Sequence, residues 1–199
     1  MSLYQSPPET VTVGGREYPV DTDFRVWADF QSILTLDGPE REKAERLAGF
    51  MARMGLPPSR EALDAMLEFY TAESRERAVA SRKARPMAFD FQQDSEYIYA
   101  AFMGAYGIDL TTVALHWWRF KALFKALPED CELCRIMRYR TVDLKNVPKE
   151  QRRFYQEQKA RYSLGKKAVH QTERDMREYV KRRFEEAQRQ MEEQNHHGR

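Results

Sequence analysis

Apolar residues recur at spacings of three and four positions along the first part of the chain, which is the pattern of amphipathic helices. Three helices are predicted before residue 72: one from the capping residues 21–23 to Asp37, one over residues 39–54, and one that Ser59 caps. Pro39 and the acidic residues after it suit a helix start. We expect three apolar faces to meet in one core, in chain order Phe24, Trp27, Phe30 and Ile33 or Leu34; Leu47, Phe50, Met51 and Met54; and Leu63, Met66, Leu67 and Tyr70.

Two short β-prone runs flank a glycine pair in the segment VTVGGREYPV, residues 11–20. Gly14-Gly15 supplies the positive φ angles of a tight two-residue turn, so the segment predicts a β-hairpin. An isolated hairpin is marginal in water, and we expect this one to lie against the helices that follow.

Three further helices are predicted between residues 90 and 139. The first opens on Asp90 with Gln93 three residues later, a capping-box pattern, and ends at Gly107. The second covers residues 110–127, and the third begins at Pro128. The first two carry apolar faces at helical spacing: Tyr97, Ile98, Ala101, Phe102 and Ala105, then Val113, Trp117, Phe120, Phe124 and Leu127.

After Pro148 the chain is rich in Arg and Glu and poor in apolar residues. A helix this polar cannot fold around its own core, so we predict an arm that is extended, partly frayed or held by a partner. The fold class expected is mainly α. Residues 1–145 form a compact helical domain with a small N-terminal β-hairpin, and residues 146–199 form a long, charged helical arm that is frayed or disordered at its end.

Charge divides the chain at a similar place. The net charge of the 199 residues is +2, but residues 1–134 hold 15 Lys/Arg and 21 Asp/Glu, whereas residues 135–199 hold 18 and 10. The body is therefore acidic and the arm basic. No run of 18 apolar residues occurs, and residues 1–11 lack a basic start followed by an apolar stretch. We expect no membrane-spanning helix, no secretory signal and a cytoplasmic location.

Few residues form the pattern of a chemical site. Cys131-x-x-Cys134 lacks the second ligand pair of a zinc site, and no predicted strand precedes it, so we expect two small residues on a buried helix face. His116 has no nucleophile or carboxylate at a recognisable spacing, which favours a histidine at the edge of the core. Neither a phosphate-binding glycine loop nor a hydrolase motif occurs. We expect no enzyme, no metal and no cofactor.

Two adjacent tryptophans stand in the segment LHWWRFKALFKALPED, residues 115–130. Trp117 belongs to the predicted core face, whereas Trp118 points about 100° further round the helix, beside Lys121 and Lys125. Trp118 is either covered by a neighbouring helix or exposed as an amphipathic anchor of the type enriched at protein interfaces.

The basic arm raises a second possibility, because a phosphate backbone is bound by clustered cations interleaved with aromatic residues. Two places are locally basic, and their cations are Arg152 and Arg153, then Lys181, Arg182 and Arg183. Elsewhere cations and anions alternate, as in RDMREYVKRRFEEAQRQ, which favours a solvated or partner-paired helix. Nucleic-acid binding is therefore the minority reading of the arm.

Three blocks of the chain resemble the bacteriophage gene-product-fifteen family, whose genes lie among the tail-morphogenesis genes of long-tailed phages and prophages. The first is GGREYPVDTDFRVWADFQ, 14–31, and the second is EALDAMLEFYT, 61–71. The third is AFDFQQDSEYIYAAFMGAYGIDLTTVALHWWRFKALFKALPED, 88–130, followed by IMRYRTVDL, 136–144, and YSLG, 162–165. The charged extension after Leu164 departs from the family pattern.

The resemblance implies a non-enzymatic tail-assembly chaperone that binds the tape-measure protein, tail-tube subunits or both. Such a protein acts in the cytoplasm of the bacterial host and is absent from the mature virion. The alternatives are a nucleic-acid-binding accessory protein and a minor structural tail component. Self-association of the acidic body with the basic arm of another copy is a further expectation. The candidate partner-binding residues are Trp118, Lys121, Lys125, Tyr97 and Phe91, with adaptable contacts expected from Met51, Met54, Met66, Met87 and Met103.

Overall fold

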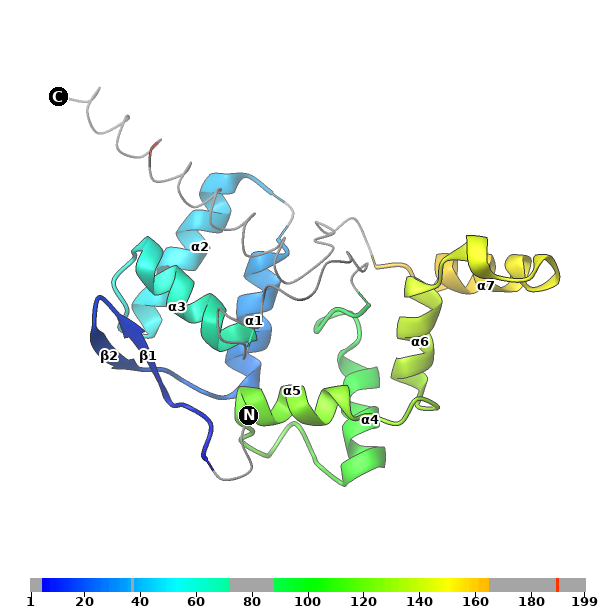
Figure 1. Cartoon of the computed structure of the whole chain (residues 1–199), viewed down its shortest axis with the longest axis horizontal. Helices are drawn as coiled ribbons and strands as arrows, with labels where there is room; N and C mark the ends of the chain where they lie inside the picture. The colour runs from blue at the N-terminus through cyan, green and yellow to red at the C-terminus, as the bar shows by residue number, and fades with distance from the viewer. Residues whose placement is uncertain (1–4, 37, 72–87, 165–188, 190–199) are drawn as a thin grey trace.

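The structure, a computed structural model, describes residues 5–36, 38–71, 88–164 and 189. Within these ranges the chain is mainly α-helical, with seven α-helices, a short 3₁₀ helix and a two-stranded N-terminal hairpin, as predicted. Figure 1 shows the hairpin and α1–α3 grouped together, α4 and α5 beside them, and α6 and α7 at the far end. Met87, Lys181, Arg182 and Arg183 lie outside the described ranges.

The predicted hairpin is confirmed. Strands β1 (Thr10–Val13) and β2 (Arg16–Pro19) pair antiparallel, with Val13 opposite Arg16 across the turn. Gly14 and Gly15 have φ angles of 57° and 78°, the left-handed conformation that a two-residue hairpin turn requires. Val11 and Val13 are buried, and β1 contacts α3, so the hairpin covers that helix rather than standing alone.

The first three predicted helices are also confirmed. They are α1 (Phe24–Leu34), α2 (Glu40–Arg53) and α3 (Arg60–Thr71). Asp23 caps α1 by accepting a hydrogen bond of 2.9 Å from the Arg25 backbone N–H. Ser59 caps α3 through its Oγ, which accepts from the Ala62 N–H at 3.2 Å. Pro39 occupies the N-cap position of α2.

The apolar faces of α1–α3 meet in one aromatic core. Trp27 is fully buried and stacks on Phe69 of α3, with ring centroids 4.5 Å apart. Phe30 packs against Phe50 of α2 at 5.2 Å. Met51 and Met66 lie inside this core with no exposed surface, so their predicted role as adaptable partner contacts is wrong for this conformation.

Helix α4 (Ser95–Tyr106) begins later than the sequence pattern indicated. Asp90 does not cap the helix directly. Its Oδ1 instead accepts from the backbone N–H groups of Gln92 and Gln93, at 3.0 and 2.8 Å, and so closes a turn that precedes the helix. Gly107, with φ of 65°, ends α4 as predicted.

Helix α5 (Trp117–Lys125) is shorter than the predicted 110–127, and Val113 is 41% exposed rather than part of the core face. Asp109 explains the difference, because its Oδ1 accepts from the Thr111 hydroxyl at 2.6 Å and from the Thr111 N–H at 2.9 Å. These two bonds lower the pKa of Asp109 and hold residues 109–113 in a turn that competes with the helix. Arg25 then donates to the Val113 carbonyl at 3.2 Å, which ties the turn to α1.

Helices α6 (Glu132–Thr141) and α7 (Lys149–Arg161) follow, joined by the 3₁₀ helix η2 (Leu144–Asn146). Tyr139 of α6 stacks on Tyr162, just after α7, with centroids 6.0 Å apart, and meets Phe154 edge-on at the same separation. Lys159 donates to the Val142 carbonyl at 2.9 Å. Helix α7 has no buried residue, so this first part of the predicted arm is attached to the body by one side only.

Candidate partner-binding surfaces

The two tryptophans and Lys121 of α5 converge on the last turn of α3. Trp117 Nε1 donates to the Tyr70 carbonyl at 2.8 Å, and Trp118 Nε1 donates to the Phe69 carbonyl at 2.8 Å. Lys121 Nζ donates to the carbonyls of Tyr70 and Thr71, at 3.0 and 2.9 Å. Helix carbonyls in a last turn lack intrahelical donors and favour a nearby cation, so this arrangement stabilises the end of α3.

Two of the candidate partner-binding residues, Trp118 and Lys121, take part in these contacts with α3. Trp118 is half-buried and its ring packs against Phe69 at a centroid separation of 5.7 Å. A neighbouring helix therefore covers part of Trp118, the first of the two alternatives weighed from the sequence. Lys121 is also half-buried. Their predicted role in binding a partner stays a prediction, carried by what remains exposed of both side chains.

Two of the other three candidates, Phe91 and Tyr97, lie outside α5, whereas Lys125 stands on α5 two turns after Trp118. Phe91 is half-buried and packs inward on Trp117 and Phe120, at 6.1 and 5.8 Å. Lys125 is exposed at the end of α5. Tyr97 is 37% exposed on α4. The candidates are thus distributed over a core position, a helix end and an open helix face.

Helix α4 presents an apolar surface to solvent. Tyr97, Tyr99 and Met103 are 36–37% exposed, and Ala100 and Gly104, which lie between them around the helix, are also exposed. We name these five residues the α4 face. A helix that is apolar on all sides is normally covered, so an α4 face open to solvent is a candidate contact surface.

The two described candidate cations of the basic arm, Arg152 and Arg153, have partners within the chain. Arg152 Nε donates to the Val147 carbonyl at 2.9 Å, and Arg153 Nε pairs with Glu157 at 3.0 Å. Both side chains are exposed, and an exposed ion pair one turn apart contributes little to stability, so Arg153 can exchange its partner.

His116 has a structural position. It is the N-cap of α5, where its Nδ1 accepts from the Trp118 N–H at 3.0 Å. Its Nε2 lies 3.0 Å from the Pro8 carbonyl, and because Nδ1 is an acceptor, Nε2 must carry the proton that this contact uses. The imidazole therefore joins the N-terminal segment to α5, at the edge of the core as expected.

The cysteine pair lies at the start of α6. Cys131 is the N-cap, and its Sγ accepts from the Cys134 N–H at 3.4 Å. Burial, and then the hydrogen bond with Cys131, raises the pKa of the Cys134 thiol to about 11. Both thiols are half-buried rather than fully buried as the sequence suggested. Over the ranges that the structure describes, no group of three His, Cys, Asp or Glu side chains could hold a metal ion.

A buried ion pair, which the sequence did not reveal, connects the second half of the chain. Arg140 of α6 binds Asp94 through Nη1 and Nη2, at 2.6 and 2.8 Å, and the two side chains are only 5% and 1% exposed. Arg140 also donates to the carbonyls of Ala88 and Tyr162. One side chain thus fixes the turn before α4, helix α6 and the end of α7.

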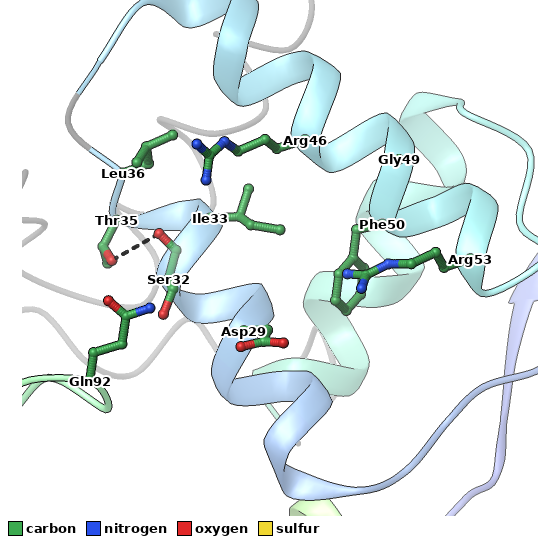
Figure 2. Close-up of a pocket in the computed structure, with 10 residues that line it drawn as sticks. All are labelled: Asp29, Ser32, Ile33, Thr35, Leu36, Arg46, Gly49, Phe50, Arg53 and Gln92. Atoms are coloured by element: carbon green, nitrogen blue, oxygen red, sulfur yellow. Dashed lines mark hydrogen bonds between the residues drawn. The ribbon is translucent and has the colours of Figure 1, made fainter. Parts of the chain in front are cut away.

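An open hollow of about 750 Å³ lies between α1 and α2, and Figure 2 shows its lining. Each helix contributes four residues at positions i, i+3, i+4 and i+7, the spacing of one helix face. From α1 and its end these are Asp29, Ser32, Ile33 and Leu36; from α2 they are Arg46, Gly49, Phe50 and Arg53. We name these eight residues the α1–α2 groove. Its floor is apolar, Arg46 and Arg53 line one rim, and Asp29 lies on the other (Figure 2).

A smaller hollow of about 280 Å³ adjoins the α1–α2 groove, because both are lined by Asp29, Ser32 and Gln92. It continues along α1 toward Arg25 and Ala28. The side of α1 that faces these hollows extends over 11 residues, which is roughly 16 Å or three helical turns. This length and an apolar floor with charged rims suit the binding of another helix.

The described helices include none that is both long enough and apolar enough to cross a membrane. What the fold defines is a mainly helical protein with an exposed apolar side on α4 and an open groove between α1 and α2. A family model for Bacteriophage Gp15 protein matches residues 5–164, most of the chain, and the chain belongs to this family. It is thus a bacteriophage protein, and the family points to phage morphogenesis. No curated protein and no solved structure matches it.

Proposed function

We propose that this chain is a non-enzymatic tail-assembly chaperone that binds the tape-measure protein, tail-tube subunits or both in the host cytoplasm. The observation that carries the proposal is the family match over residues 5–164. The resemblance of the chain to products of tail-morphogenesis genes supplies the biological setting. It also implies that the protein leaves before the virion is complete.

The exposed apolar surface supports the same proposal on physical grounds. A tape-measure protein is long and helical, and before the tail tube surrounds it, its apolar stripes need to be covered. The α4 face offers aromatic rings and the flexible thioether of Met103, which adapt to helices of different sequence. We therefore assign the client to the α4 face in the first instance.

The decisive experiment is co-expression with the tape-measure protein of the same locus, followed by affinity capture and size-exclusion chromatography at moderate salt. We expect a co-eluting complex in which the client stays in solution. A client that aggregates while this chain elutes alone would contradict the proposal.

Gly104→Gln adds bulk to the α4 face at an exposed position with no atom near its added Cβ, and it should weaken the complex. The matched control is Gly49→Gln, on α2 away from α4.

Purified virions distinguish the chaperone from a structural tail component. Mass spectrometry should find the tape-measure protein in virions and should not find this chain. Its presence at a stoichiometry comparable with that of known tail proteins would favour the structural alternative. Nucleic-acid binding would instead show an affinity that falls steeply as salt rises.

A further inference from the structure

We propose that the α1–α2 groove is the docking site for helix α7 of a second copy of this chain, so that copies associate head to tail. The inference goes beyond the chaperone function and does not require the client. It rests on two complementary surfaces of the same molecule, each of which is exposed.

The first surface is the exposed side of α7 next to its contact with α6. Glu150, Arg153, Phe154 and Glu157 stand at positions i, i+3, i+4 and i+7, and all four are exposed. We name them the α7 face. Phe154 is 49% exposed, more than any other large apolar side chain in the described ranges. The Phe154 ring meets Tyr139 of α6 edge-on, and its exposed part is the apolar centre of an otherwise polar helix side, which is the form of a helix that docks on a partner.

The second surface is the α1–α2 groove, whose α2 rim has the same spacing with opposite charge. Arg46 and Arg53 are seven residues apart on α2, and Glu150 and Glu157 are seven residues apart on α7. Both separations are about 10.5 Å along a helix, so two antiparallel or parallel helices can bring both charge pairs together at once. Ile33 and Leu36 are half-buried and offer the apolar surface at the level where Phe154 would enter, whereas Phe50 is only 1% exposed beneath Arg53.

The existing contacts of these charges are weak enough to be exchanged. Arg46 pairs with Glu42 at 2.8 Å, with the two side chains 55% and 45% exposed. Glu157 pairs with Arg153, with 61% and 91% exposed. Arg53 lies over the Phe50 ring at 5.1 Å and has no carboxylate partner among the described residues. Exposed pairs of this kind contribute little, so their replacement by pairs between copies costs little.

Shape and position complete the argument. Gly49 is exposed at the middle of the α2 rim, and a Cβ added there would meet no atom within 4 Å, so a partner backbone can approach closely at this point. In Figure 1, α7 lies at the opposite end of the molecule from α2, and an α7 face in this position cannot reach its own groove. Two different surfaces on one molecule make a heterologous contact, which produces rings or open chains of copies.

The test uses two full-length variants and their mixture. In one, Arg46→Glu and Arg53→Glu reverse the charge of the groove; in the other, Glu150→Lys and Glu157→Lys reverse the charge of the α7 face. Sedimentation velocity is measured at low ionic strength and at protein concentrations from low to high micromolar. The sedimentation coefficient of the unsubstituted chain should rise with concentration as copies associate. Each variant alone places like charges together and should associate at least about tenfold more weakly. The mixture should associate again, because each groove then meets an α7 face of opposite charge.

Steric variants provide the matched control. Gly49→Gln, in the groove, should weaken self-association at least about tenfold, whereas Gly104→Gln, on α4, should leave it unchanged. A monomer at every concentration and at low salt overturns the proposal. So does a mixture that stays as weak as the single variants, or an effect of Gly104→Gln equal to that of Gly49→Gln. A photocrosslinking residue at position 49 identifies the occupant: crosslinks to α7 of another copy support the assignment, and crosslinks to residues 165–199 or to the client refute it.

Discussion

Replacing Arg140 by methionine tests whether the buried ion pair holds the second half of the chain together. Methionine keeps an unbranched apolar stem of similar length, so the packing of the side chain is largely preserved. The substitution removes the two hydrogen bonds to Asp94, at 2.6 and 2.8 Å, and the hydrogen bonds to the carbonyls of Ala88 and Tyr162. The Asp94 carboxylate, 1% exposed, then still accepts from the Asp90 N–H at 2.8 Å.

The magnitude follows from this geometry. Removal of one member of a buried ion pair leaves an uncompensated charge and typically costs about 3–5 kcal/mol. The free energy of unfolding of a domain is only about 5–15 kcal/mol, so Arg140→Met should remove a large part of it. For a chain of this size that corresponds to a fall in Tm of roughly 6 to 20 °C.

Urea unfolding followed by tryptophan fluorescence and far-UV circular dichroism measures the change. Trp27 and Trp117 are buried, so their emission reports the loss of the core. The matched control is Arg135→Met on the same helix, which breaks an exposed pair with Glu132 and should cost less than about 1 kcal/mol. If the free energy of unfolding of Arg140→Met lies within about 1 kcal/mol of that of the unsubstituted chain, the ion pair does not hold α4, α6 and the end of α7 together. Asp94→Asn combined with Arg140→Met should cost less than the sum of the two single substitutions.

Three further predictions concern single side chains. Trp118→Phe, which keeps a ring but cannot donate to the Phe69 carbonyl, should lose about 1 kcal/mol, and Trp118→Ala about 2 kcal/mol, measured by urea unfolding; an unchanged stability of Trp118→Phe would mean that the bond contributes nothing. Gly107→Ala should destabilise by about 1 kcal/mol because of its φ of 65°, whereas Gly49→Ala in a helix should stabilise by about 0.5–1 kcal/mol. Since a raised pKa keeps the Cys134 thiol protonated, its alkylation at pH 8 should be slow and should accelerate toward pH 11; fast alkylation at pH 8 would contradict this. The free energy of unfolding should fall as pH rises above 9, because the thiol ionises in the unfolded chain before it does in the folded one.

The parts of the fold that local chemistry determines were predictable from the sequence. Gly14-Gly15 defines the hairpin turn, Ser59 caps α3, and Gly107 ends α4, because each acts on its own neighbours. The predicted helix over 110–127 began too early, because Val113 and Trp117 have helical apolar spacing although Val113 lies in the turn before α5. The signal that could have corrected it is Asp109 two residues before Thr111, a pair that forms a competing side-chain turn.

The candidate surfaces depend on residues far apart in the sequence, and no spacing rule predicts them. Asp94 and Arg140 are separated by 46 positions, so nothing local distinguishes their pair from exposed charges. Trp118 shows the same limit: its helical angle predicted that it leaves the core stripe, but only the structure shows that the end of α3 covers part of it. The α1–α2 groove likewise requires the mutual position of two helices.

The contact between α5 and the end of α3 has a consequence for the order of events during synthesis. Tyr70 and Trp117 are 47 residues apart, and His116 reaches back 108 residues to Pro8. At about 5–20 residues per second, the ribosome needs roughly 2 to 10 s to make the chain between Tyr70 and Trp117. During that interval α3 has been made but lacks its covering indoles and ammonium group. Synthesis of α5 is therefore the step that completes the N-terminal half, and a nascent chain stalled before residue 117 should be markedly more sensitive to proteases than one released after residue 125.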